Sequence, residues 1–261
     1  MVKEKKFFGT FTDYKCGGTL ISKNFVLTAA HCQPKPIMSH LVVVLGQYSL
    51  NQTDLPTISV NRVIVHKKFN QSNFHNDIAL LELATPADIS AKVYPICLPG
   101  AKDHFVGYDG VVSGWGRLYY NGELPRTLQC VTVPILSQRQ CSSMLRKHGH
   151  IKELPNFFLC AGHEGGRFDA CEGDSGGPLA VYLKSGQWVL AGTVSHGVRC
   201  AEPGLPGVYM KVSHYRPWID AVIQRIESAA KSPQPQSWFY PFLDWLDRTV
   251  PIKISTPVIY Y

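Results

Sequence analysis

Three short motifs, far apart along the chain, constrain its fold most, because each supplies a different part of one nucleophilic site. His31 lies in the motif TAAHC, Asp77 opens the motif DIAL, and Ser175 lies in the motif GDSGGP. A serine hydroxyl becomes a strong nucleophile when a neighbouring imidazole removes its proton, and that imidazole needs a buried carboxylate that orients it and stabilises its charged form. The chain must therefore fold so that these three residues meet.

Glycines flank the candidate nucleophile and have a role of their own. Gly173 allows the backbone to turn so that its N–H and the N–H of Ser175 point at one developing oxyanion. The GDSGG run by itself is also typical of a surface turn, since these residue types dominate turns. Three motifs in one order favour the catalytic interpretation.

The order His, Asp, Ser, within these motifs, resembles the trypsin- and chymotrypsin-like serine proteases. The resemblance extends from about Phe8 to Glu227 and includes VVSGWGR at 111–117 and PGVY at 206–209. The stretch Cys141–Gly162 is most similar to arthropod proteases of the Stubble and clip-domain type.

The resemblance implies a serine endopeptidase that works through an acyl-enzyme. His31 would be the general base, Asp77 the residue that orients it, and Ser175 the nucleophile. Protein substrates and protein inhibitors are the implied partners, and no cofactor is implied. The loop after Gly46 lacks the glutamates that hold calcium in trypsins, so we expect no metal there.

The implied fold is all-β, with two antiparallel β-barrels of the six-stranded type and a C-terminal helix. Short β-rich runs at 41–45, 60–66 and 188–195, separated by Gly, Pro and Asn, agree with such a pattern. The first barrel, expected from Phe8 to Leu98, would lack its N-terminal strand, and the second would run from Gly110 to Ser213.

The helix is predicted over Tyr215–Ile226, because apolar residues recur there at helical spacing. We assign residues 1–228 to the protease domain and 229–261 to a Pro-rich linker and an aromatic tail. Five aromatics within Trp238–Trp245 could dock on the barrel, bind a partner or touch a membrane surface. Asp244 within that segment and Asp247 just after it argue against insertion into a membrane.

Composition limits the class of protein and its surroundings. The chain has 261 residues, of which 45% are apolar and 17% charged, enough for a large dry core. Its net charge of +7 comes from scattered basic residues, which favours a solvated surface over nucleic-acid binding. Eight cysteines, with glycosylation motifs at Asn51 and Asn70, indicate an oxidising, extracellular setting, although no signal peptide is present in this sequence.

The resemblance also implies how the cysteines pair. The expected disulfides are Cys16–Cys32, Cys141–Cys160 and Cys171–Cys200. Cys97 and Cys130 are expected to stay unpaired, with a bond between the two as the lesser alternative, because the family partners of these positions would lie upstream of Met1.

The resemblance implies a substrate preference set by Asp169, which stands six residues before Ser175. With Ser195, Gly197 and Gly207 it would form an open pocket whose carboxylate selects Arg or Lys. Two residues depart from the family pattern. His196 replaces a flat apolar tryptophan of the substrate cleft, and Arg199 places a cation near the pocket mouth.

Members of the family are activated by a cut before a sequence like Ile-Val-Gly-Gly, whose new amino group pairs with the carboxylate before the serine, here Asp174. This sequence has no such segment before Cys16. We therefore expect Asp174 to turn outward or bind a proton, since a buried unpaired carboxylate is costly. Three interpretations stay open: a fragment of a longer protease, a non-catalytic binding module, and an unstable truncated chain.

Overall fold

Two β-sheets pack side by side and leave the candidate site between them. The computed structural model describes residues 1–6, 12–34, 39–149, 154–166, 169–196, 200–231 and 256–261. The strands of the N-terminal half are β1 Val2–Lys6, β2 Thr12–Cys16, β3 Thr19–Leu20, β4 Phe25–Thr28, β5 Ser39–Val44, β6 Thr57–Val65 and β7 Ala79–Leu83, with the short 3-10 helix η1 at Ala30–Cys32. The strands that follow are β8 Asp109–Gly114, β9 Gln129–Leu136, β10 Phe158–Ala161, β11 Pro178–Tyr182, β12 Trp188–His196, β13 Gly207–Lys211 and β14 Val258–Tyr260, and the α-helices are α1 Gln138–Lys147 and α2 Val212–Lys231.

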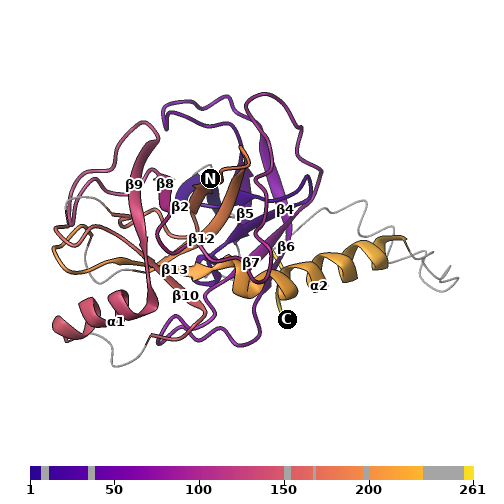
Figure 1. Cartoon of the computed structure of the whole chain (residues 1–261). Coiled ribbons are helices and arrows are strands. Elements are labelled where there is room, and N and C mark those ends of the chain that lie inside the picture. The colour runs from indigo at the N-terminus through magenta and orange to yellow at the C-terminus, as the bar shows by residue number, and fades with distance from the viewer. Residues whose placement is uncertain (7–11, 35–38, 150–153, 167–168, 197–199, 232–255) are drawn as a thin grey trace, which may run out of the picture.

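The N-terminal sheet is an open path and the second sheet closes on itself (Figure 1). The first follows the order β2-β1-β5-β6-β7-β4-β3, and β14 joins it by pairing with β6. The second is a closed barrel in the order β10-β13-β12-β11-β8-β9. The prediction of an all-β fold with one complete and one incomplete barrel and a C-terminal helix is confirmed. The N-terminal sheet begins at Val2, ahead of the predicted Phe8, since β1 pairs with both β2 and β5.

A shared hydrophobic core holds the two halves and α2 together. Phe25 and Leu80 from the N-terminal sheet are buried in the same cluster as Leu190 and Met210 from the barrel. The buried face of α2 joins this cluster through Tyr215, Ile219, Val222 and Ile226, which recur at helical spacing. The cleft between the halves therefore has a rigid base, because close-packed interiors resist deformation.

Both helices have clear sequence causes, although only α2 was predicted. The predicted span Tyr215–Ile226 lies within α2, which is longer at both ends. The start of α1 is a capping box: the Ser137 side chain accepts from the Gln140 N–H, and the Gln140 side chain reaches back to the Ser137 N–H. The S-x-x-Q pattern was the signal available in the sequence. Among the described residues, no helix is long and apolar enough to cross a membrane.

Three disulfides tie loops to this framework. They join Cys16 to Cys32, Cys141 to Cys160, and Cys171 to Cys200, and close loops with sequence separations of 16, 19 and 29 residues. Each disulfide that closes a loop of this length stabilises the folded protein by about 3 kcal/mol, because it restricts the freedom of the unfolded chain. Cys97 and Cys130 are exposed and form no disulfide within the described part of the chain.

Candidate active site

Asp77 and His31 form a tightly bonded pair at the edge of the N-terminal half. Asp77 is fully buried, and its Oδ1 accepts the His31 backbone N–H at 2.9 Å. Its Oδ2 lies 2.7 Å from His31 Nδ1 and accepts the Ser195 hydroxyl at 2.6 Å. Since a carboxylate only accepts, Nδ1 carries the proton, and Nε2 is left with a free lone pair.

Strand pairing brings these two residues together. His31 lies on η1, directly after β4, and Asp77 lies two residues before β7. The two strands are antiparallel neighbours in which Thr28 faces Ala79. The disulfide from Cys32 to Cys16 then anchors η1 to the end of β2. Residues 46 positions apart thus meet because their strands are adjacent.

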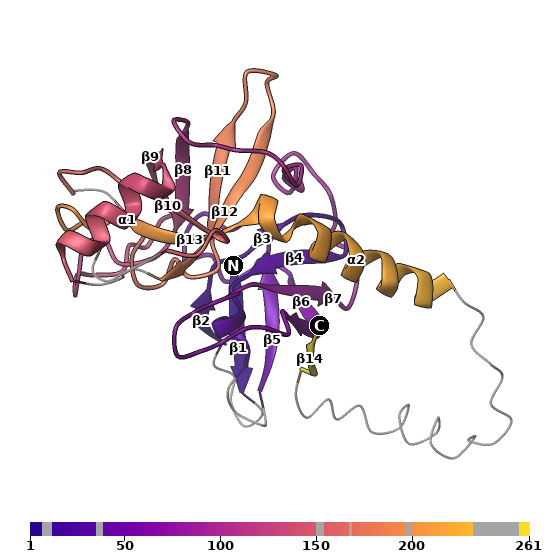
Figure 2. The same ribbon diagram turned by 60° about the horizontal axis from the view of Figure 1, so that its bottom comes forward.

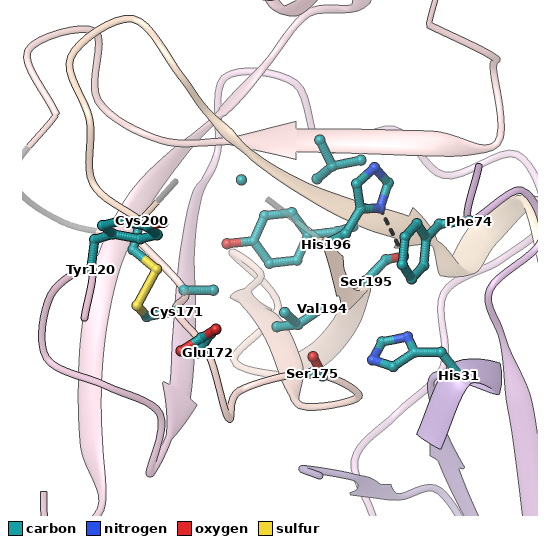
Figure 3. A pocket seen from close by; sticks show the side chains of 14 residues that line it. His31, Phe74, Tyr120, Cys171, Glu172, Ser175, Val194, Ser195, His196 and Cys200 are labelled. Atoms are coloured by element: carbon teal, nitrogen blue, oxygen red, sulfur yellow. Dashed lines mark hydrogen bonds between the residues drawn. A yellow bond between two sulfur atoms is a disulfide. The ribbon is translucent and has the colours of Figure 1, made fainter. Parts of the chain in front are cut away.

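Ser175 enters the same cavity from the C-terminal half. The loop that carries it is held by the Gly17 N–H, which donates to the Ser175 carbonyl at 2.8 Å. The cavity of about 280 Å³ is lined by His31, Ser175 and His196, among others. Figure 3 shows the Ser175 hydroxyl and the His31 ring facing this space. Gly176 has φ +78° and no room for a Cβ, which would lie 2.7 Å from the Gly17 carbonyl.

Two backbone donors beside Ser175 are available to a ligand. Gly173 has φ +101°, a conformation that favours glycine. Its carbonyl accepts the Tyr14 hydroxyl, which secures the turn from the other side. Within the described residues, neither the Gly173 N–H nor the Ser175 N–H donates a hydrogen bond to the protein. Both can therefore serve an oxygen that acquires negative charge.

Asp169 lies next to the cavity and is partly buried. Its Oδ1 lies against Gly207, where any Cβ would collide with it, and Gly207 itself lines the cavity. Burial raises the pKa of Asp169 to about 7, and the nearby Asp174 charge adds to this. The Cys171–Cys200 disulfide forms another wall. Gly197 and Arg199, named from the sequence, lie outside the described residues.

The comparison with known proteins agrees with this geometry. The family model for trypsin matches residues 4–219, nearly the whole chain ahead of the tail. The chain belongs to the trypsin family. It is 38% identical over 223 residues to Trypsin-1 of the crayfish Astacus astacus, covering 84% of this chain and 91% of that one.

Two Drosophila melanogaster proteins have higher identities to this chain. Serine protease filzig is 46% identical over 227 residues, and serine proteinase stubble is 41% identical over 222 residues. The matches cover 85% and 84% of this chain, but only 13% and 28% of those proteins. The chain thus spans only a small part of the length of these two relatives. The resemblance to the Stubble type, based on the Cys141–Gly162 stretch, is confirmed.

An aromatic stack borders the site at His196, the position where the resemblance implied a tryptophan. The rings of His196 and Phe74 are stacked, 4.9 Å apart with an interplanar angle of 20°. Phe74 also meets the His31 ring edge-on at 5.6 Å (Figure 3). Burial lowers the pKa of His196, which favours its neutral form. The sequence marks His196 as a departure from the family pattern but does not mark Phe74, since nothing in the local pattern distinguishes that phenylalanine from an ordinary loop residue.

Asp174 points inward, contrary to the alternative that it turns outward. Its carboxylate is buried and accepts the Gly116 N–H at 2.8 Å and the Cys171 N–H at 2.9 Å. Glycine is required at 114 and 116, because a Cβ at either would collide with this carboxylate. Burial raises the pKa of Asp174, while the two hydrogen bonds oppose the rise. In the described part of the chain, no basic side chain forms an ion pair with it.

In the described part of the chain, one group of potential metal ligands lies beside the site. The ligand atoms of Cys16, His31 and Cys32 lie within 4.8 Å of one another. The two sulfurs are joined in a disulfide, and a metal needs free thiolates. This cluster is therefore structural as long as that bond is intact.

Proposed function

We propose that this chain is a serine endopeptidase that cleaves proteins after Arg or Lys. The observation that carries the proposal is the buried Asp77, which holds His31 so that its Nε2 can serve the hydroxyl of Ser175 in a shared cavity. The N–H groups of Gly173 and Ser175, which donate to none of the described residues, support it. Membership of the trypsin family makes protein substrates the expected class.

In the proposed mechanism, His31 Nε2 takes the proton from Ser175 Oγ as this oxygen attacks the substrate carbonyl. The carbonyl oxygen becomes negative and is held by the N–H groups of Gly173 and Ser175. Asp77 stabilises the imidazolium, which then gives its proton to the leaving amine. Water, activated by the same imidazole, attacks the acyl-enzyme, releases the carboxylic acid and restores Ser175.

Asp169 is proposed to select the cationic side chain on the substrate. A cation that enters the pocket exchanges water for a charge-assisted hydrogen bond, whereas an apolar side chain leaves the carboxylate buried and unpaired. Ser195, Gly197 and Gly207 would complete the pocket. We further propose residues 1–228 as the protease domain, an extracellular setting because of the three disulfides, and protein inhibitors as partners.

Asp174 favours a second candidate function, a protease fold that binds a partner without catalysis. A carboxylate this deeply buried, with no paired cation among the described residues, is stabilised when it binds a proton or when the loop shifts. A shift of residues 173–175 would misplace both oxyanion donors. Loss of one such donor lowers kcat about 10²–10³-fold in other proteases.

Labelling of Ser175 by a fluorophosphonate distinguishes the two functions. We expect slow labelling of the chain alone and labelling at least about tenfold faster when an Ile-Val dipeptide supplies a free ammonium to Asp174. The measurement is the rate of adduct formation by mass spectrometry, with Ser175→Ala as the unreactive control. No labelling under either condition would contradict the endopeptidase and support the binding module. Asp174→Asn, which cannot pair with the ammonium, is expected to remove the dipeptide effect.

Benzamidine, a small cation, tests Asp169 without any turnover. Because burial raises the Asp169 pKa to about 7, the carboxyl is protonated below that pH and must lose its proton to bind the amidinium. The apparent affinity should therefore rise about tenfold per pH unit up to roughly pH 7 and level off above it.

Calorimetry in two buffers with different ionisation enthalpies measures both the affinity and the proton released. At about pH 6 nearly one proton should leave per benzamidine bound. Asp169→Asn is expected to bind weakly with no such pH dependence. An affinity that is constant over this range in the unmodified chain would show that Asp169 is already ionised or does not meet the ligand.

A further inference from the structure

The end of the chain returns to the N-terminal sheet as a parallel strand. β14 pairs with β6 in the register Val258 to Val63, Ile259 to Ile64 and Tyr260 to Val65. The Val63 N–H donates to the Pro257 carbonyl at 2.8 Å, and the Tyr261 N–H donates to the Val65 carbonyl at 2.8 Å. The Lys67 N–H donates to the Tyr261 carbonyl at 2.6 Å, so the contact continues beyond the strand.

This strand fills a place that β5 leaves open. β5 pairs with β6 only over Thr57–Ser59, whereas β14 pairs over Val63–Val65. β5 meets the segment that leads into β14 at Thr256. The buried Thr256 hydroxyl accepts the Leu41 N–H of β5 at 2.9 Å. An open edge presents unpaired backbone groups, and an added strand satisfies them. Figure 2 shows β14 beside β5 and β6, below α2.

Side chains of the segment contact three parts of the protein. Val258 packs against the core of the N-terminal sheet, and Tyr261 against the core shared by both halves. The Trp218 indole N–H of α2 donates to the Tyr261 carbonyl at 3.1 Å, and the Arg225 guanidinium lies over the Tyr261 ring at 5.0 Å. The contact thus combines backbone pairing, buried apolar area and a cation–π interaction.

We propose that the β6 edge over Val63–Lys67 is a binding site for a parallel strand, and that its occupant is the segment Thr256–Tyr261 of the same chain, which we call the C-terminal strap. Recognition by strand addition takes affinity from main-chain hydrogen bonds and specificity from the side-chain pockets. A segment tethered to its own site acts at an effective concentration on the order of millimolar, which favours the chain's own strap over a free peptide.

Contacts of the strap also lead to the chain neighbours of His31 and Asp77. The Tyr260 hydroxyl donates to Oε1 of Gln33 at 3.3 Å, and Gln33 lies two residues after His31. On the other side, the strap binds Trp218, whose ring meets the His66 ring at 5.2 Å.

From His66 the contacts continue to Asp77. The His66 ring meets Tyr215 at 5.4 Å, and the Tyr215 hydroxyl donates to Asn76 Oδ1 at 3.0 Å. Asn76 directly precedes Asp77. The strap thus contacts Gln33 directly and is linked to Asn76 through Trp218, His66 and Tyr215.

Hydrogen exchange of the full chain tests the strap without requiring activity. In Val258→Asp, a charge replaces an apolar anchor, and the amides of Val63 and Lys67 should exchange at least about tenfold faster. The Ser59 region of β6, paired with β5, should keep its protection and serves as an internal reference. Adding the synthetic peptide TPVIYY to this variant should restore the protection at Val63 and Lys67.

Two further variants keep the test decisive. Thr256→Val preserves the shape of the buried side chain but removes the acceptor of the Leu41 N–H, so exchange at Leu41 alone should accelerate. Tyr260→Phe removes only the hydrogen bond to Gln33 and should leave the β6 amides protected. Unchanged exchange at Val63 and Lys67 in Val258→Asp would overturn the proposal. Protection that appears only at protein concentrations where the chain dimerises would assign the strap to a second copy and overturn it equally.

Discussion

Replacing Asp77 by asparagine is expected to lower kcat/KM for an arginyl substrate about 10⁴-fold, the loss seen when the corresponding change is made in a relative. Asp77 accepts three hydrogen bonds, two from His31 and one from Ser195. An asparagine at this position offers one acceptor and one donor group, so it favours the imidazole tautomer with the proton on Nε2. That tautomer cannot remove the proton from Ser175.

Steady-state kinetics of Asp77→Asn over a range of pH measures this effect. Ser195→Ala is the matched control, because it removes one donor to the same carboxylate and leaves both His31 contacts in place. Its loss in kcat/KM should be about 10- to 100-fold, the value of one hydrogen bond to a charged group, and so well below that of Asp77→Asn. A loss of similar size in both variants would mean that the burial of Asp77, and not the His31 tautomer, governs activity.

Replacing Asp169 by serine is expected to lower kcat/KM for arginyl and lysyl substrates about 10³-fold, because truncating one member of a buried charge pair costs 2–5 kcal/mol or more. The activity on a substrate with an apolar side chain should rise slightly, since no carboxylate is then left unpaired. The measurement is kcat/KM for a matched pair of ester substrates that differ only at the cleaved residue.

Glu172 supplies the control for Asp169. It also lines the cavity, but its side chain is 67% exposed and pairs with Arg117 at 2.8 Å. An exposed ion pair contributes little stabilising free energy, so Glu172→Gln should change kcat/KM for either ester by less than about threefold. If Asp169→Ser lowers kcat/KM equally for both ester substrates, Asp169 supports the shape of the pocket and does not select the substrate.

Much of the fold follows from local patterns. The apolar spacing of Tyr215–Ile226 predicted α2, and the β-rich run at 188–195 predicted β12, because the periodicity of burial is written into neighbouring residues. The capping box that begins α1 was readable in the same way. The strand β14 was not predicted, since β6 meets it from nearly 200 residues away and nothing local marks a short apolar run as a partner.

The sequence alone determined which chemical groups the site contains and in what order. His31, Asp77 and Ser175 could be named from three motifs, since a nucleophile, a base and a carboxylate are properties of residue types. The tertiary structure decided where the groups point and what surrounds them. The inward carboxylate of Asp174, the stack of Phe74 on His196 and the docking of the strap all depend on contacts between distant segments. Such contacts arise from close packing of the whole chain, and a local pattern does not encode them.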